Sequence, residues 1–308
     1  MTTNVDQVYI AKRRRNFWPY FLIAPAAAVI FLILGFPVYR LLTLSFQKYG
    51  LEEIVSGKQV WVGITNFSKL VKDHDFWLIL VKTFAFTIGM VFFTISIGAW
   101  IAHLMLRMHK AIRWVLNSIL IMVWAMPALV GISIWKWMFS FEFSIITATI
   151  NRLGFDFAQR NWFTNPVSGF SIIGAIVVWG AIPFVTISIY AALTQVPKEI
   201  LESAALDGAN RSQIFRSIIL PILIPIYVIL ISLSIIWDFQ VFTQIWIMLD
   251  GRPAKEYYTM SIYAFEQSFG QSEYGLGAAI AIFMIIALLG VTWFYIKKMV
   301  EIGDADEK

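Results

Sequence analysis

The residue with the clearest chemical potential in this 308-residue chain is Asp238, the only acidic side chain deep inside an apolar stretch. A carboxylate near the centre of a membrane costs about 2.5–3.5 kcal/mol on insertion scales, so it should face a cavity or a partner rather than lipid. Ser234 lies one helical turn earlier on the same face, with Val241 just beyond. The same stretch contributes further hydrogen-bonding groups from Gln240, Thr243 and Gln244. This arrangement suits the binding of a polar solute.

The sequence lacks the side chains that acid–base catalysis or metal binding would need. No second carboxylate or clustered histidine accompanies Asp238 within the apolar stretches, which argues against a membrane enzyme. His74, His103 and His109 lie near the ends of apolar stretches without ligand spacing, and the sequence has no cysteine, so we expect no metal site. A phosphate loop of the G-x-x-x-x-G-K-[ST] type is also missing. We therefore expect a chain that is not an enzyme by itself.

The composition places these residues in a membrane. The chain is 59% hydrophobic and 14% charged, against about 45–50% and about 25% in soluble domains. Six apolar stretches reach the length of about 20 residues that a helix needs to cross a bilayer. They are Phe17–Tyr39, Phe76–Leu106, Trp114–Phe139, Phe170–Leu193, Ile222–Leu249 and Gly275–Tyr295. We expect an all-α polytopic protein with six transmembrane helices, with Pro127 and Pro183 inside the third and fourth.

Basic residues alternate to one side of these stretches. They follow one another as Lys12 to Arg15, then Arg107, Lys110 and Arg113, then Lys198, Arg211 and Arg216, then Lys297 and Lys298. The positive-inside rule assigns that side, with both termini, to the cytoplasm. We expect a cytoplasmic tail over residues 1–16, a transmembrane domain over 17–296 and a second cytoplasmic tail over 297–308.

The cytoplasmic loop at 195–221 reads as two short helices. Pro197 suits the first position of one helix, and Gly208 suits its end. Asn210, followed three residues later by Gln213, fits a capping box that starts a second short helix running toward Leu220. A stripe of mostly small side chains recurs along the first helix at Leu201, Ala204, Ala205 and Gly208. By pattern alone, this stripe is either a docking surface or the side of a loop that folds back on its own bundle.

The residues of this loop resemble a known family signature. Glu202-Ser203-Ala204-Ala205, Asp207-Gly208-Ala209 and Ile219-Leu220-Pro221 are similar to the EAA signature of binding-protein-dependent ABC importer permeases, with Ser203 in place of the first Ala. Further matches extend over nearly the whole chain and resemble the sugar-transporter branch, in particular its maltose-permease-like first subunit. These matches are Trp61-Val62-Gly63 with Asn66-Phe67, Asp75-Phe76-Trp77, Trp179-Gly180-x-x-Pro183-Phe184, Asp250-Gly251-x-Pro253 and Tyr274-Gly275-x-Gly277-Ala278-Ala279.

The resemblance implies an ATPase-coupling role for the loop, in which it sits in a cleft of an ATP-hydrolysing subunit. The coupling residues would be Glu202, Ala204, Ala205, Asp207 and Gly208. ATP and Mg²⁺ would be bound by two partner ATP-binding-cassette subunits, and this chain would hold no cofactor. The other implied partners are a second homologous permease subunit, an extracytoplasmic sugar-binding protein and membrane lipid, with no nucleic acid.

The resemblance also implies a substrate pathway. On the fourth span its contact positions map to Val177, Gly180, Ala181 and Phe184, and on the fifth to Ser234, Asp238 and Val241. Val241 is apolar, whereas the maltose-type relatives have a polar residue at its position. This difference puts in doubt both a polar role for Val241 and a substrate shared with those relatives. Asp238 contacts either the substrate or the second permease subunit.

The function implied is that of a permease subunit of an ATP-driven, binding-protein-dependent importer of a disaccharide or oligosaccharide, working by alternating access in the bacterial cytoplasmic (inner) membrane. The alternative is a permease for glycerol-3-phosphate or a related polar metabolite. An anionic ligand would require Arg or Lys in the cavity, and the acidic Asp238 argues against this alternative. An ion-gradient-driven transporter should instead show symmetric broken helices and several buried ionisable groups, whereas Asp238 is essentially alone.

Overall fold

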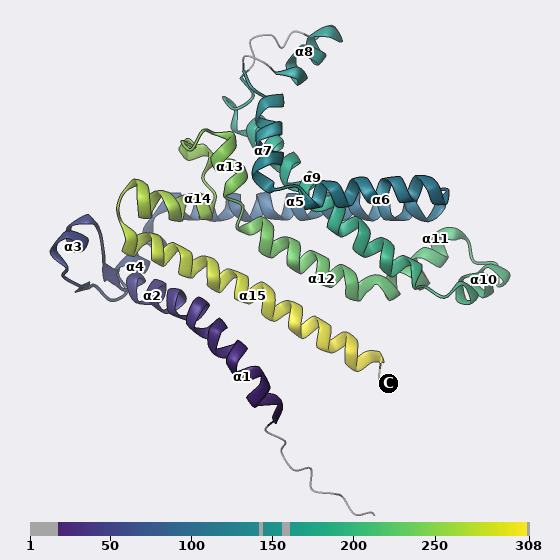
Figure 1. The fold of residues 1–308 in the computed structure, drawn as a ribbon, viewed down its shortest axis with the longest axis horizontal. Coiled ribbons are helices and arrows are strands. Elements are labelled where there is room, and N and C mark those ends of the chain that lie inside the picture. Colours follow the sequence, from purple (N-terminus) through teal and green to yellow (C-terminus); the bar gives the residue numbers. More distant parts are fainter. Residues whose placement is uncertain (1–17, 142–143, 156–160, 307–308) are drawn as a thin grey trace, which may run out of the picture.

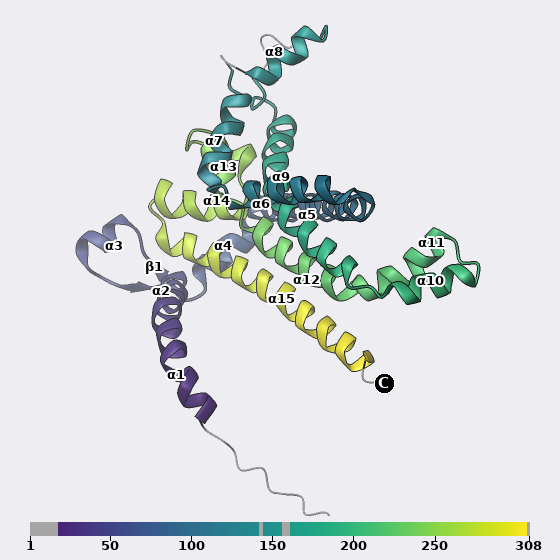
Figure 2. The same cartoon turned by 45° about the vertical axis from the view of Figure 1, so that its right-hand side comes forward.

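A computed structural model describes residues 18–141, 144–155 and 161–306, and these residues are almost entirely helical. The longest helices are α5 (His74–Arg107), α9 (Pro166–Thr194), α12 (Leu220–Phe239) and α15 (Tyr274–Asp306). In Figures 1 and 2, α12 and α15 run side by side along the bundle. One short antiparallel ribbon pairs β1 (Gln47–Lys48) with β2 (Val60–Trp61). The all-α fold predicted from the sequence is confirmed.

Five helices in the described residues are long and apolar enough to cross a membrane, and the number is six if one bent helix pair is counted as a single span. The first of the five combines α1 (Trp18–Ile30), the π-helical η1 (Phe31–Gly35) and α2 (Phe36–Ser45). The predicted start of this span at Phe17 lies outside the described residues. The candidate spans are Tyr20–Ser45, His74–Arg107, Pro166–Thr194, Arg211–Phe239 and Tyr274–Glu301.

The third predicted span is not one straight helix. It is divided into α6 (Lys110–Ala125) and α7 (Ala128–Met138), which meet at an angle of 98°. Met126 and Pro127 have extended ψ angles of 131° and 129°. A proline disfavours helical geometry in the residue before it and has no N–H to continue the ladder. Pro127 therefore ends one helix and starts the next, whereas α9 runs through Pro183 unbroken.

The fifth span and the loop before it also differ from the prediction. We predicted a helix over Ile222–Leu249, but α12 ends at Phe239 and a separate α13 spans Thr243–Met248. The second loop helix was predicted to be short and to run toward Leu220. Instead α11 (Arg211–Ile214) continues through the π-helical η2 (Phe215–Ile219) into α12. A single continuous helix over Arg211–Phe239 thus joins the loop to the middle of the bundle.

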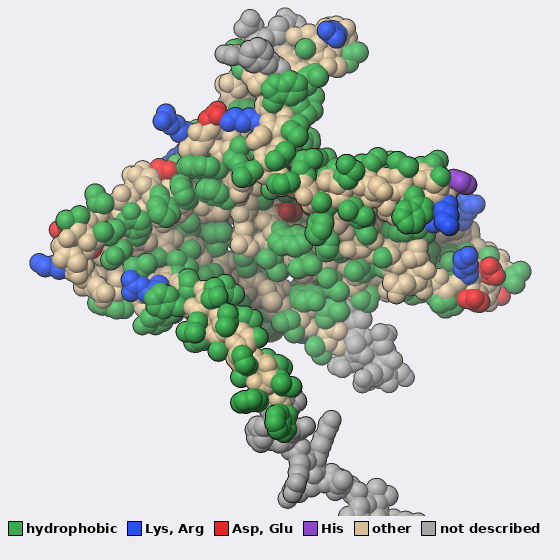
Figure 3. Space-filling view, in the orientation of Figure 1, with side chains coloured by type: hydrophobic (Ala, Val, Ile, Leu, Met, Phe, Trp, Pro, Cys, Tyr) green, Lys and Arg blue, Asp and Glu red, His purple; other side chains and the backbone are tan. Residues whose placement is uncertain are grey.

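The two ends of the bundle differ in what they carry. In Figure 1 the loop helices α10 (Lys198–Leu206) and α11 lie at the right, the described start of α1 lies at the bottom, and the end of α15 lies between them. At the opposite end lie α3 (Leu51–Ser56), α4 (Thr65–Lys72), η3 (Lys255–Tyr257), α14 (Met260–Phe265) and η4 (Glu266–Gly270), and α8 (Ile145–Arg152) projects beyond α7. Figure 3 shows charged side chains mostly at the ends and a largely hydrophobic middle. Among the basic loops predicted to be cytoplasmic, the loop between α5 and α6 and the one at the end of α15 lie at the same end of the bundle as the loop that carries α10, whereas Lys12 to Arg15 lie outside the described residues.

The core forms where helices approach closely. A Cβ placed on Gly98 of α5 would lie 2.6 Å from the Val185 Cγ1 of α9. The Val185 side chain therefore packs directly against the backbone of α5. At the end opposite α10, the buried Asn66 amide donates to the backbone oxygens of Ser45 and Gln47, each at 2.9 Å. Gly275, in the first turn of α15, lies against the same backbone.

This contact at Gly275 gives a test of the fold. A Cβ at Gly275 would lie 2.1 Å from the Gln47 carbonyl oxygen, a backbone atom that cannot rotate away. We expect Gly275→Ala to lower the free energy of unfolding by about 1–3 kcal/mol, the usual cost of overpacking. Thermal unfolding of the purified transporter measures this. Gly89→Ala is the matched control, because nothing lies within 4 Å of its Cβ position; equal stability of the two variants would contradict the packing described here.

Candidate functional site

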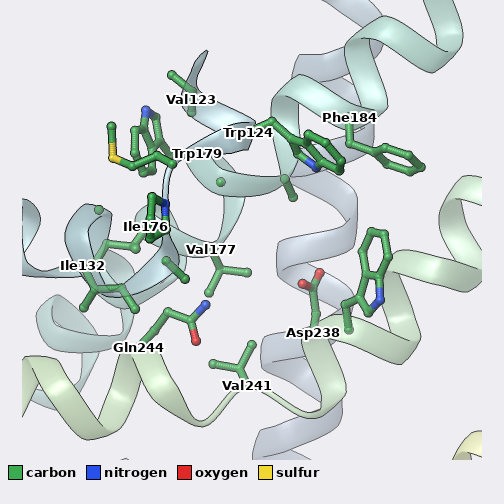
Figure 4. A pocket seen from close by; sticks show the side chains of 17 residues that line it. Val123, Trp124, Ile132, Ile176, Val177, Trp179, Phe184, Asp238, Val241 and Gln244 are labelled. Carbon is green, nitrogen blue, oxygen red and sulfur yellow. The ribbon is translucent and has the colours of Figure 1, made fainter. Parts of the chain in front are cut away.

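A cavity of about 300 Å³ lies within the bundle, between α9 and the two breaks in the third and fifth spans (Figure 4). Its lining comes from α6, α7, α9, the end of α12 and the start of α13. The lining residues are Val123, Trp124, Met126, Pro127, Ala128, Gly131, Ile132, Ile176, Val177, Trp179, Gly180, Ala181, Phe184, Trp237, Asp238, Val241 and Gln244.

The two breaks create this space. The bend at Pro127 turns α7 away from the line of α6, which opens room beside α9. The break after Phe239 places Asp238 in the last turn of α12 and Gln244 in the first turn of α13. Figure 4 shows the Asp238 carboxylate and the Gln244 amide extending into the cavity from those two helices. Each break therefore brings side chains to the cavity that a straight helix would direct elsewhere.

Asp238 is buried without its full set of partners. The residue is 5% exposed, and its Oδ2 atom has no hydrogen-bond partner in the described part of the chain. Leaving a charged acceptor unsatisfied costs more than the roughly 1–3 kcal/mol of a neutral group. A carboxylate kept in this state is suited to accept hydrogen bonds from a bound molecule or from another subunit.

The remaining wall is aromatic and apolar. The Phe184 and Trp237 rings meet edge to face with centroids 5.6 Å apart, and Trp179 lies 6.0 Å from Trp135. The Cβ position of Gly180 has no heavy atom within 4 Å, so this glycine leaves open space beside the rings. Among the described lining residues none is Lys or Arg. Rings with a few oxygen acceptors suit a sugar, whose C–H faces stack on rings while its hydroxyls donate.

Six of the seven residues predicted for the substrate pathway come together at this cavity: Val177, Gly180, Ala181, Phe184, Asp238 and Val241. Ser234 is not among the lining residues: it lies one turn before Asp238 on α12 and is 4% exposed. Sequence reasoning missed Trp124, Pro127 and Trp237 as lining residues. The proline within the third span was the available signal, since broken helices at membrane depth are tolerated where they line a cavity.

The loop residues predicted for coupling lie on α10 and directly after it. Its end is a Schellman motif: the Gly208 N–H donates to the Ala205 oxygen at 3.1 Å, and the Ala209 N–H donates to the Ala204 oxygen at 3.0 Å. Gly208 has a φ of +87°, which an L side chain rarely adopts. Asp207 is the residue between the helix and this glycine. The C-terminus of α10 is therefore capped at Gly208, where the sequence predicted that this helix would end.

The start of the next helix is closed equally well. The Gln213 N–H donates to the Asn210 Oδ1 at 3.0 Å, and the Asn210 N–H donates to the Gln213 Oε1 at 2.7 Å. The predicted capping box is confirmed. Between α10 and α11 lies a hollow of about 320 Å³, lined by Asp207, Gly208, Ala209, Gln213, Ile214, Ser217 and Ile218.

The exposed surface of α10 shows that this loop does not fold back on its bundle. None of the helix residues is buried, and Glu202 and Ala205 are exposed. Leu206 is 89% exposed, an unusual position for a large apolar side chain. Figures 1 and 2 both show α10 and α11 projecting from the bundle. Their arrangement suits contact with another protein.

Comparison with known proteins identifies the family of this chain. Residues 94–300 match the family described as "Binding-protein-dependent transport system inner membrane component". The chain is 34% identical to the diacetylchitobiose uptake system permease protein DasB of Streptomyces coelicolor, covering 93% of this chain and 88% of that protein. It is 27% identical to the trehalose/maltose transport system permease protein MalF of Thermococcus litoralis, covering 90% and 92%.

The fold also has a close counterpart among solved structures. A crystal structure of a bacterial ABC transporter involved in the import of the acidic polysaccharide alginate contains a chain that superposes with a TM-score of 0.78 at 19% identity. The superposition covers 94% of this chain and 96% of that one. At this identity the likeness establishes the fold alone.

The unpaired oxygen of Asp238 gives a test that separates a binding role from a structural one. We expect Asp238→Leu to leave the unfolding temperature of the purified transporter unchanged or to raise it, because it removes a buried, unsatisfied carboxylate. Asp73→Leu is the matched control and should lower stability by about 1 kcal/mol or more. Asp73 accepts from the Tyr263 hydroxyl at 3.0 Å and from the Asp75 N–H at 3.0 Å. An equal loss in both variants would mean that Asp238 is paired with another subunit.

Proposed function

The chain belongs to the family of binding-protein-dependent transport system inner membrane components, and we propose that it is the permease subunit of an ATP-driven importer of a neutral disaccharide or oligosaccharide. The observation that carries this proposal is the cavity within the bundle. Aromatic rings line it, and one buried oxygen of the Asp238 carboxylate has no hydrogen-bond partner in the described residues. Such a site can take hydroxyl donors from a solute and stack its apolar faces.

The charge of the lining narrows the substrate class. The described residues around the cavity include Asp238 and no cationic side chain. An anionic solute would meet repulsion there, which disfavours glycerol-3-phosphate and acidic saccharides as substrates. The two relatives are named for diacetylchitobiose and for trehalose or maltose, which supports a carbohydrate.

The projecting α10 supports an ATP-driven mechanism. We assign Glu202, Ala204, Ala205, Asp207 and Gly208 to the contact with a partner ATPase, two copies of which would bind ATP and Mg²⁺. A well-capped helix transmits a push as a rigid body, whereas a flexible loop would absorb it. A second homologous permease would complete the pathway, and an extracytoplasmic binding protein would deliver the sugar to the outer end. This chain would contribute no catalytic residue.

In this mechanism the cavity opens alternately to the two sides. Ligand-loaded binding protein and ATP would favour the outward-facing state, and hydrolysis would return the inward-facing state. Such coupling requires that the sugar and the nucleotide each bind the two states with different free energies. Asp238 and Phe184 would supply that difference at the sugar.

The substrate assignment is tested by uptake into vesicles that contain the assembled transporter and its binding protein. The probes are diacetylchitobiose, trehalose and maltose, with an alginate oligosaccharide as the anionic comparison. We expect a neutral sugar to be taken up, and Asp238→Asn and Phe184→Ala each to reduce uptake about tenfold or more, through loss of a charged acceptor and of a stacking ring.

Phe294→Ala is the matched control for Phe184→Ala, because Phe294 is an aromatic residue of α15 that is 62% exposed and lies outside the cavity. It should leave uptake unchanged. Normal uptake in both cavity variants, or preference for the alginate probe, would refute the proposed pathway.

The coupling assignment is tested at Gly208. We expect Gly208→Leu to abolish uptake and sugar-stimulated ATP hydrolysis while leaving the affinity for the loaded binding protein intact, because the left-handed backbone at this position is strained by a side chain at about 1–2 kcal/mol. Gly57→Leu is the control, since Gly57 has a φ of +66° and equally open surroundings at the opposite end. The same effect in both variants, or in neither, would show that α10 is not the transmitting contact.

A further inference from the structure

We propose that Ser261, assisted by Thr259, is a positioning residue that holds the break between α12 and α13 and thereby sets how Asp238 and Gln244 meet the transported solute. The inference rests on the proposed function in one respect, namely that the cavity binds the solute. The key contact joins the Ser261 hydroxyl to the backbone oxygen of Val241, at 2.6 Å.

The backbone oxygens at the end of α12 show why an outside donor is needed. The Gln240 side-chain amide donates to the Ile236 oxygen at 2.8 Å. The Gln240 and Val241 N–H groups donate to the Trp237 and Asp238 oxygens, each at 3.3 Å. These contacts close the helix from within. Val241 lies in the break itself, is 6% exposed, and its oxygen is bonded by two hydroxyl groups from another segment.

The second of these hydroxyl groups belongs to Thr259. Its Oγ1 lies 3.3 Å from the Val241 oxygen and 3.1 Å from the Ser261 Oγ. Thr259 occupies the N-cap position of α14, yet its side chain makes no capping bond to that helix. A threonine at this position ordinarily caps the helix that follows. Its hydroxyl is directed to the break instead, and the residue is 1% exposed.

The segment that carries both hydroxyl groups is itself fixed to α5. The Met260 N–H, between them, donates to the Thr83 Oγ1 at 3.0 Å. Thr83 in turn donates to the Ile79 oxygen of its own helix at 2.8 Å. Met260 and Thr83 are both almost fully buried. A chain of buried hydrogen bonds thus runs from α5 through the start of α14 to the break.

The position of this contact gives it leverage over the cavity. Asp238 and Gln244 each lie within one helical turn of Val241, on opposite sides of the break. A rotation of the Val241 peptide would therefore move both polar side chains relative to α9. Binding groups need to be held to within about 0.5 Å of their productive positions by supporting contacts of this kind.

Amide hydrogen exchange in the purified transporter tests the positioning role without any substrate. We expect Ser261→Ala to speed exchange of the amides between Phe239 and Trp246 roughly tenfold, because the Val241 oxygen loses its shorter bond. Ser261→Thr keeps the hydroxyl and should exchange like the parent chain. Ser171→Ala is the matched control, since the Ser171 hydroxyl donates only to the Val167 oxygen of its own helix at 2.7 Å.

Uptake of the neutral sugar found to be transported provides the second readout. We expect Ser261→Ala to raise the apparent KM for that sugar about tenfold with an unchanged maximal rate, and Ser261→Thr to restore it. Thr259→Val should change KM in the same direction but less, because its contact is longer. Should Ser261→Ala fail to assemble, the Thr259→Val variant carries the test.

The outcomes separate this inference from the proposed function. Unchanged exchange at residues 239–246 in Ser261→Ala, or a fall in maximal rate with KM unchanged, overturns the positioning role. Faster exchange in the Ser261→Ala variant of a transporter that takes up none of the sugar probes would support the positioning role of Ser261. It would refute the assignment of the cavity to saccharides.

Discussion

The structure depends on one constraint: inside a membrane, every backbone N–H and C=O group must find a partner within the protein. Helices satisfy this automatically, so each interruption has to be compensated locally. Two interruptions are placed at Met126–Pro127 and at Gln240–Phe242, and residues from both line the same cavity. The bonds that repair the second one come from α14 and from the Gln240 side chain. The cavity is therefore a product of how the breaks are repaired.

The same helix that carries the second break also reaches the end of the bundle that carries α10. A continuous helix runs over Arg211–Phe239, a length of 29 residues, or about 43 Å at 1.5 Å per residue. Its first turn is closed by the capping box of Asn210 and Gln213, shortly after Gly208, and its last turn holds Asp238. A displacement of α10 by a partner would thus be applied to one end of a rod whose other end bears the buried carboxylate. This continuity gives the proposed coupling a physical route that needs no series of intermediate contacts.

The sequence predicted most of the fold, because apolar length and basic loops are local signals. It also predicted the end of α10 and the capping box, since Gly208 and the Asn210–Gln213 pair act within a few residues of themselves. The end of α12 at Phe239 was not predictable in this way. The apolar run continues through α13 with no proline or glycine at the break, and the bonds that fix it come from Ser261 and Thr259, about twenty positions away. Ser234 was assigned to the pathway by its match to the family's contact positions, which cannot show that α12 begins to line this cavity only at Trp237, about one turn after Ser234.

The most direct test of the cavity as the solute pathway uses the absence of cysteine from the sequence. A Gly180→Cys variant of the assembled transporter would place a single thiol of this chain in the open space of the cavity, and Gly290→Cys would place one on α15 outside it. We predict that a membrane-impermeant thiol reagent modifies the Gly180→Cys variant and that a transported neutral sugar slows this modification, with no effect of sugar on the Gly290→Cys variant. A Gly180→Cys thiol that stays unmodified from both sides of the membrane, or that reacts at the same rate with and without sugar, would contradict the account.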